Sequence, residues 1–228
     1  MSKQDDAAGE MLIREVEEDL RREYYARLWS RYGNWLIAAA ILVVAIVAGY
    51  EGWQAWQSKK STEDSARYNA VDVLLREDKM TEAIDALEAL RKDSSTGYAT
   101  LAGLQEAALL VREKKTDEAR ALYDKIAEDT STPQSYRDVA KLTSALLLLD
   151  TPDSTKVEAM MRPLTAVSSP WRALALEITA AALLKNNEKD RAVDLYRQVA
   201  DVAAFPDEVR LRASYMLMTL GVKPKEGQ

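Results

Sequence analysis

The longest uncharged apolar stretch of the chain lies near its start. Residues 32–50 contain no charged side chain over 19 positions. As an α-helix they would extend about 28 Å, close to the thickness of a bilayer's hydrocarbon core. Aromatic residues, Trp35 and Trp53 among them, mark the two ends, where such rings favour the headgroup region. The pattern predicts a transmembrane helix at 32–50.

Two other interpretations of this stretch remain open. A helix buried in a protein core has a similar composition, although the rest of the chain does not look able to surround it. A cleavable signal peptide usually has an apolar stretch of about 7–15 residues behind a short basic start. Here 31 residues precede a longer stretch, and only Val47-Ala48-Gly49 offers a weak cleavage site. We favour an uncleaved signal anchor.

Basic residues near the two ends predict the orientation of the span. Five arginines lie within 20 residues before it, and three basic residues lie in the same window after it. This bias favours a cytoplasmic N-terminus and a C-terminal part on the other side of the membrane. In a bacterium that side is the oxidising periplasm, where a chain without cysteine forms no stray disulfides.

An amphipathic helix is expected before the span. Ile13, Val16, Leu20, Tyr24 and Leu28 recur at three- and four-residue spacing and would share one face. This face would either lie in the lipid interface, with nearby arginines on anionic headgroups, or dock a cytoplasmic partner. The first interpretation is the one we favour.

After the polar residues 58–65, apolar positions repeat along the rest of the chain. Eight pairs of like residues are offset by 73 positions: Leu101/Leu174, Ala107/Ala180, Ala108/Ala181, Leu110/Leu183, Ala119/Ala192, Leu122/Leu195, Tyr123/Tyr196 and Ile126/Val199. Half of this offset reaches further matches, such as Ala83 with Ala119. The period predicts four helical hairpins that begin near residues 61, 97, 134 and 170, followed by a last helix at about 206–220.

Small residues recur at matched positions of these hairpins. Antiparallel helices approach closely only where side chains are short, and a larger residue one turn later fills the groove to the next hairpin. The expected packing positions are Ala107, Leu110, Ala119, Tyr123, Ala180, Leu183, Ala192 and Tyr196. Because a single hairpin buries only part of its apolar surface, the stack provides the core. We predict an all-α protein with a single transmembrane helix followed by an α-solenoid of helical hairpins.

The composition removes most kinds of chemistry. The chain has neither His nor Cys, which excludes thiol nucleophiles, Ser-His-Asp triads, disulfides and zinc sites built on these residues. Its 31 basic and 37 acidic residues give a net charge of −6, a poor basis for nucleic-acid binding. Acidic pairs such as Asp117-Glu118 suit helix starts, and the methionines suit gaps in packing. We expect no enzymatic activity, no cofactor or metal, and no small-molecule substrate.

The repeating unit resembles the tetratricopeptide repeat. The first helix carries a small residue and then Leu, as in Ala107 and Leu110, and the second carries Ala and then Tyr, as in Ala119 and Tyr123. The period is nearer 36 than 34, and the Trp and Leu-Gly features of the consensus are missing. In the unit at 134–169, Val157 and Met161 replace the expected Ala and aromatic residue, and Pro163 is expected to end or kink the second helix.

The order of motifs along the whole chain resembles the ancillary subunits of the Sec translocon, a family of bacterial inner-membrane proteins. The motifs are the aromatic residues of 24–33, Gly-Tyr-Glu-Gly-Trp-Gln-Ala-Trp at 49–56, Ser-Ala-Arg-Tyr at 65–68, the helix start at 97–102 and Trp-Arg-Ala at 171–173. The resemblance implies a tetratricopeptide-like domain in the periplasm. It also implies, as partners, Sec translocon subunits and periplasmic chaperones or exported clients. The chain departs from the family at its N-terminus, where the first 20 residues make the segment before the span longer than in the family.

Small residues also recur along the predicted span. Ala38, Ala45, Gly49 and Gly52 fall on one side of the helix, where a second membrane helix can approach closely. With Trp35 and Trp53 at its ends, this side is a candidate contact for a channel helix. The alternative is that the alanines only lower the hydrophobicity of the span.

These expectations define the organisation of the chain. The predicted segments are a cytoplasmic segment with an amphipathic helix at 1–31, the transmembrane helix at 32–50, a linker at 51–65, the tetratricopeptide-like periplasmic domain at 66–222 and a disordered tail at 223–228. The expected function is a membrane-anchored scaffold for protein–protein interaction at the export channel. The alternative is an inner-membrane regulator whose cytoplasmic helix acts on a signalling or stress-response partner.

Overall fold

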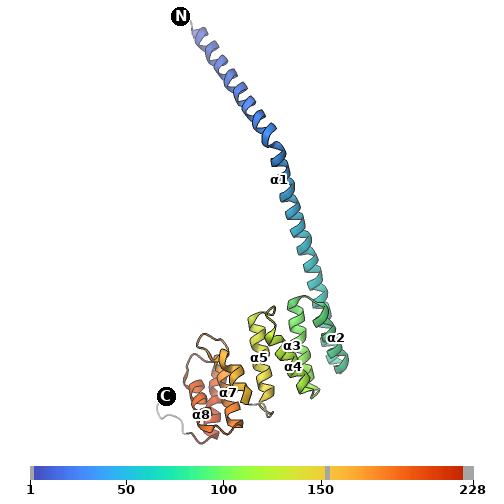
Figure 1. Cartoon of the computed structure of the whole chain (residues 1–228), viewed down its shortest axis with the longest axis vertical. Coiled ribbons are helices and arrows are strands. Elements are labelled where there is room, and N and C mark those ends of the chain that lie inside the picture. Colours follow the sequence, from blue (N-terminus) through green and yellow to red (C-terminus); the bar gives the residue numbers. More distant parts are fainter. Residues whose placement is uncertain (1–2, 152–154, 223–228) are drawn as a thin grey trace. The chain divides into compact units, whose positions relative to one another are not determined.

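Helices make up all regular structure in the part of the chain that the structure describes. The computed structural model describes residues 3–151 and 155–222 (Figure 1). The helices are α1 (Lys3–Arg76), α2 (Met80–Asp93), α3 (Thr96–Arg112), α4 (Thr116–Glu128), α5 (Gln134–Leu148), α6 (Val157–Met161), the 3₁₀ helix η2 (Arg162–Thr165), α7 (Arg172–Lys185), α8 (Lys189–Asp201) and α9 (Asp207–Thr219). The chain divides into two compact units, Met1–Lys59 and Lys60–Gln228.

The first unit is the N-terminal part of α1. From Trp29 onward it contains an 18-residue window with a mean hydropathy of 2.0, of which 6% is buried. By length and composition this helix can cross a membrane, as the sequence predicts. The indole of Trp29 lies over Gly33, and the rings of Trp53 and Trp56 pack with centroids 5.5 Å apart. The backbone of 13–28 is helical, but the side chains of the predicted apolar face lie outside the described residues.

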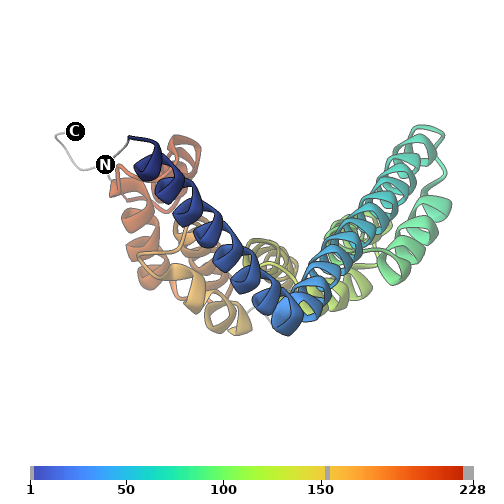
Figure 2. The same ribbon diagram turned by 90° about the horizontal axis from the view of Figure 1, so that it is seen from above.

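The second unit is a row of antiparallel helical hairpins. The C-terminal part of α1 pairs with α2, α3 with α4, α5 with α6, and α7 with α8, while α9 packs on α8. In Figures 1 and 2 the colours run from green through yellow to red along this row. The predicted hairpin starts near 97, 134 and 170 agree with α3, α5 and α7, and the predicted last helix with α9. The all-α fold with a tetratricopeptide-like helical array is confirmed.

Three of the hairpins share one tight turn. Asp78, Lys114 and Asn187 have φ values of 60°, 63° and 63°, in the left-handed region. In each turn the next residue donates its backbone N–H to a carbonyl five positions earlier, as from Lys115 to Leu110 at 2.9 Å. This is the Schellman arrangement, which satisfies carbonyl groups at the end of the first helix. The turns are offset by 36 and 73 residues, so the sequence period is also a period of backbone conformation.

The third hairpin departs from this pattern, as the sequence predicts. Its second helix, α6, has 5 residues, whereas α4 and α8 have 13 each. Pro163 lies in the first turn of η2, directly after α6 ends at Met161. In the interior of an α-helix, proline has no backbone N–H to donate to the carbonyl four residues earlier, so an α-helix cannot continue through it undisturbed. Val157 and Met161 are nevertheless fully buried, so they still supply core at this hairpin.

Of the predicted linker, residues 51–59 belong to the first unit and residues 60–65 to the second. The whole stretch 51–65 is helical within α1. Asp64 is buried and accepts hydrogen bonds from the backbone N–H of Ser95 at 3.0 Å and from its hydroxyl at 3.2 Å. Its carboxylate thus holds the residue that precedes α3. The predicted tail at 223–228 lies outside the described residues.

The left-handed turn residues differ in how well they suit their conformation. A side chain with a Cβ is disfavoured there, whereas Gly is free to adopt it and Asn tolerates it. We expect Lys114→Gly to stabilise the full-length chain by about 0.5–1 kcal/mol. Asn187→Gly, the matched control one repeat pair later, should have a smaller effect. Thermal unfolding in detergent, followed by circular dichroism, measures both, and a destabilised Lys114→Gly would contradict the assigned role of this turn.

The buried carboxylate of Asp64 gives a second prediction. Asp64→Ala removes the acceptor and leaves the Ser95 N–H without it in a poorly hydrated place, which costs about 1–3 kcal/mol. We expect a lower melting temperature for the full-length chain in detergent. Glu63→Ala, on the exposed neighbouring position, is the control and should change little. Equal melting temperatures for both variants would contradict a stabilising role of the contact between Asp64 and Ser95.

Candidate interaction surface

The predicted packing residues of the second hairpin lie together in one core cluster. Ala107 and Leu110 of α3 contact Ala119 and Tyr123 of α4, and both alanines are fully buried. The Tyr123 hydroxyl donates to the carbonyl of Leu104 at 3.5 Å, and burial raises its pKa. These short side chains let the two helices approach closely, so the hairpin presents its remaining side chains outward at defined positions.

The fourth hairpin repeats this arrangement. Ala180 and Leu183 of α7 share a cluster with Ala192 and Tyr196 of α8. Burial, together with the nearby charge of Glu177, raises the pKa of Tyr196 to about 12, so this phenol stays protonated at any physiological pH. The predicted packing positions therefore fall into two groups, one at each of two hairpins, and belong to the core beneath the surface.

Two cavities open between successive hairpins. The first, of about 320 Å³, is lined by the end of α2, the start of α3, the last turns of α4 and the loop after it: Arg91, Ser94, Ala99, Thr100, Leu122, Lys125, Ile126, Asp129, Ser131 and Thr132. The second, of about 380 Å³, is lined by α6, η2, α7 and α8: Glu158, Arg162, Thr165, Leu176, Thr179, Leu183, Arg191, Asp194 and Leu195. Leu122 and Leu195, a pair in the sequence repeat, occupy matched places in the two.

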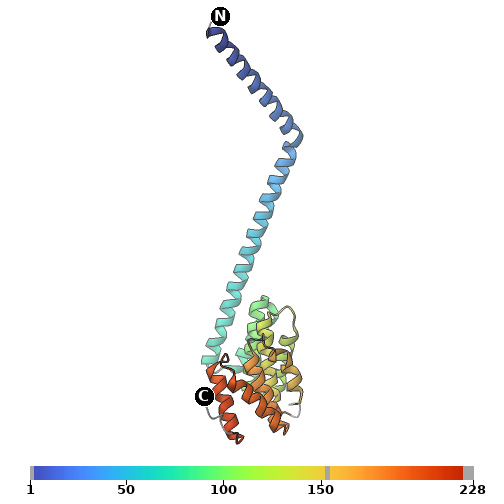
Figure 3. The same ribbon diagram turned by 90° about the vertical axis from the view of Figure 1, so that its left-hand side faces the viewer.

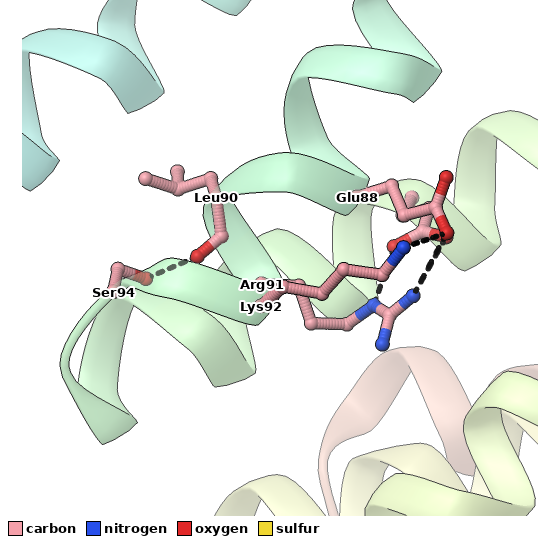
Figure 4. Close-up of polar contacts among 6 residues, drawn as sticks. Glu88, Leu90, Arg91, Lys92 and Ser94 are labelled. Carbon is pink, nitrogen blue, oxygen red and sulfur yellow. Dashed lines mark hydrogen bonds and ion pairs between the residues drawn. The ribbon is translucent and has the colours of Figure 1, made fainter.

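Ion pairs between helices shape the first cavity. Arg91 of α2 donates through Nε to Oε2 of Glu106 of α3 at 2.7 Å and through a second nitrogen to Oε1 at 3.3 Å. Figure 4 shows the side chains of Arg91 and Lys92 pointing towards Glu88, which is also in α2. Lys92 contacts Glu88 at 2.7 Å. The Lys92 contact lowers the pKa of Glu88. Since Glu106 is buried, its bidentate pairing keeps the guanidinium fixed at the cavity wall.

The second cavity combines an apolar wall with charges of both signs. Leu176, Leu183 and Leu195 supply the apolar surface. Arg191 of α8 contacts Glu158 of α6 and Glu188, each at 2.6 Å, and these contacts raise its pKa. Such a surface suits a segment of another protein, with an apolar side chain in the cavity and polar groups near the charged residues.

The residues predicted to anchor the chain lie exposed on the first unit. Trp35 is 77% exposed and Trp53 62% exposed, and Ala38, Ala45 and Gly49 are exposed as well. A Cβ built on Gly49 meets no atom within 4 Å. The helix therefore leaves this side open for lipid or for another helix.

The helix-to-helix ion pairs could not be read from the sequence. Arg91 and Glu106 lie 15 residues apart, and Glu158 and Arg191 lie 33 apart. The position of Glu106 is taken by Thr179 in the fourth hairpin, so these pairs do not follow the repeat. Among the described residues, no group of three or more His, Cys, Asp or Glu is arranged to hold a metal ion.

The comparisons with known proteins agree with the hairpin array. A family model described as a tetratricopeptide repeat-like domain matches residues 26–210, from before the apolar stretch into α9. No curated protein and no solved structure matches the chain at a significant level. The family match covers well over half of the 228 residues and includes the helices that line both cavities. The chain belongs to the tetratricopeptide repeat-like domain family.

Proposed function

We propose that this protein is a membrane-anchored scaffold at the bacterial Sec translocon. In this proposal α1 crosses the inner membrane through residues 32–50, with its N-terminus in the cytoplasm and the hairpin array in the periplasm. The array binds periplasmic chaperones or exported clients, and the span holds them beside the channel. The fold itself supports the coarser statement, since tetratricopeptide-like arrays typically bind other proteins.

One observation carries the proposal: a single chain joins an exposed apolar helix to an array with open cavities between its hairpins. The apolar window of α1 is almost entirely exposed, which is unfavourable in water and favourable in lipid. The cavities offer apolar and charged groups together, as sites for protein segments do. The resemblance of the motif order to ancillary translocon subunits supports the choice of the export channel.

Topology is the first test, and the chain suits it because it contains no cysteine. Asp117→Cys places one thiol on the exposed surface of α4, and Ser2→Cys places one at the N-terminus. In intact cells a small, charged maleimide that passes the outer membrane but not the inner membrane should label Asp117→Cys and leave Ser2→Cys unlabelled. After the inner membrane is permeabilised, both should react. Labelling of Ser2→Cys alone in intact cells would reverse the orientation and remove the array from the periplasm.

Association with the channel is the second test. Ala45→Leu together with Gly49→Leu replaces two small residues by large ones and preserves insertion, because Leu is more apolar than either. If a channel helix packs on this side, co-purification of channel subunits from native membranes should fall by about fivefold or more. A variant with Val43→Phe and Val47→Phe, on the opposite side of the helix, should recover the channel as the wild type does.

Two outcomes would contradict this role for the span. Equal channel recovery from the Ala45/Gly49 variant and the wild type would remove the small-residue side as the contact. A soluble cytoplasmic regulator, recovered in place of channel subunits from crosslinked membranes, would favour the alternative in which the cytoplasmic helix carries the function.

A further inference from the structure

The second hairpin covers part of its own surface with an arginine. The side chain of Arg91 crosses α3 at Gly103, where a Cβ would lie 3.0 Å from Arg91 Cδ and 3.1 Å from Ile126 Cδ1. One turn further along α3, the guanidinium ends in its bidentate pair with Glu106. Gly103 and Glu106 are both buried, and the first cavity lies beside them without being lined by either. The missing side chain at residue 103 therefore makes room for the arginine.

The fourth hairpin has different residues at the matched positions. Seventy-three residues after Arg91, Gly103 and Glu106, the chain carries Leu164, Leu176 and Thr179. Leu164 is buried in the core cluster that joins α5, α6 and α7. Leu176 and Thr179 instead line the second cavity. Figure 3 shows this hairpin, in orange, next to the red α9. The surface that an arginine covers in the second hairpin is thus part of an open cavity in the fourth.

The floor of the second cavity suits an apolar side chain. Leu176, Thr179 and Leu183 are 5%, 6% and 2% exposed. The Thr179 hydroxyl donates to the backbone carbonyl of Ala175 at 2.7 Å, so its hydrogen is already satisfied within α7. An apolar occupant would therefore leave no donor of this floor without a partner. The volume of about 380 Å³ is ample, because an apolar cavity of about 150 Å³ can hold a benzene ring.

The rim of the second cavity adds a preference for one sign of charge. Arg191 is paired with two glutamates, and Asp194 contacts Arg197 at 3.8 Å. Arg162, at the start of η2, lines the cavity, is exposed and has no ion-pair partner among the described residues. An acidic group of the occupant would pair with it, and the gain would be modest because the site is solvated.

We propose that the second cavity binds a large apolar side chain next to an acidic residue, in an unfolded segment of another protein. Leu176 and Thr179 determine this specificity, because they leave open the surface that Arg91 covers in the second hairpin. An unfolded segment fits, since it exposes apolar side chains that a folded protein buries. The inference rests on the proposed function in taking exported clients as the source of the segment.

Peptide binding to the full-length chain in lipid nanodiscs tests the occupant. The probe is a fluorescein-labelled Gly-Ser-Glu-Leu-Gly-Ser peptide, and empty nanodiscs correct for partition into lipid. Fluorescence anisotropy should show binding about tenfold tighter than for the same peptide with Ala in place of Leu. Thr179→Phe fills the cavity and should abolish this difference, whereas Thr179→Val keeps the shape of the floor and should bind as the wild type does. Equal binding of the Leu and Ala peptides would overturn the proposal.

Charge reversal at the rim tests the same site without a change in the core. The wild type should bind the Glu peptide about threefold more tightly than the peptide with Lys in place of Glu, and Arg162→Glu should reverse this preference. Lys125→Glu is the matched control, because Lys125 lines the first cavity, is exposed and has no ion-pair partner in the described part of the chain. Reversal by Lys125→Glu and not by Arg162→Glu would place the segment at the first cavity and overturn the proposal.

The two proposals fail separately. Peptide binding is measured on the purified chain, so its result depends on neither the topology nor the channel. Loss of the Leu and Glu preferences, with channel subunits still recovered from native membranes, would overturn this inference alone. Both preferences without channel recovery would support the cavity as a segment-binding site and contradict only the proposed place at the channel.

Discussion

The close approach of two helices at short side chains is the constraint on which the array depends. Ala83, Ala119 and Ala192 occupy the same place in three second helices, and each is fully buried. Where two helices pack this closely, only the methyl group of an alanine fits between their backbones. A larger side chain at such a position would overpack the contact. Once the helices are this close, the next residues on the same face reach the following hairpin, and the pairwise contact grows into a continuous core.

This constraint explains which parts of the molecule could be predicted. A contact that recurs in each hairpin requires the same residue type at matched sequence positions. The matches of Ala107 with Ala180 and of Tyr123 with Tyr196 therefore predict the hairpins from the sequence alone. The apolar stretch of α1 was equally predictable, because its signal is length and lack of charge. The linker was not: residues 58–65 are polar, yet Asp64 is buried because its carboxylate meets the Ser95 backbone, a contact that occurs once.

The candidate cavities were beyond sequence reasoning for the same physical reason. Their walls combine repeat positions, such as Leu122 and Leu195, with charged residues that differ from one hairpin to the next. Because apolar residues recur in the sequence repeat, a similar cavity forms at each of the two places. The charged residues do not follow the repeat, so the two cavities differ in their charged groups. Arg91 is held by Glu106 in one groove, whereas Arg191 bridges Glu158 and Glu188 in the other. Two grooves of one origin can therefore select different protein segments.

The irregular third hairpin shows how the array accepts a defect without losing its core. Val157, Met161 and Leu164 are buried at the spacing that Ala119, Tyr123 and Ile126 have in α4, although α6 ends after one turn and a 3₁₀ helix continues. Ser144 replaces the small residue of the first helix and donates its hydroxyl to Asp124 of the preceding hairpin. The larger of the two cavities lies beside this short helix. Packing needs side chains at the right spacing rather than a full helix, so the chain can shorten a helix here, keep the stack intact and leave a cavity beside it.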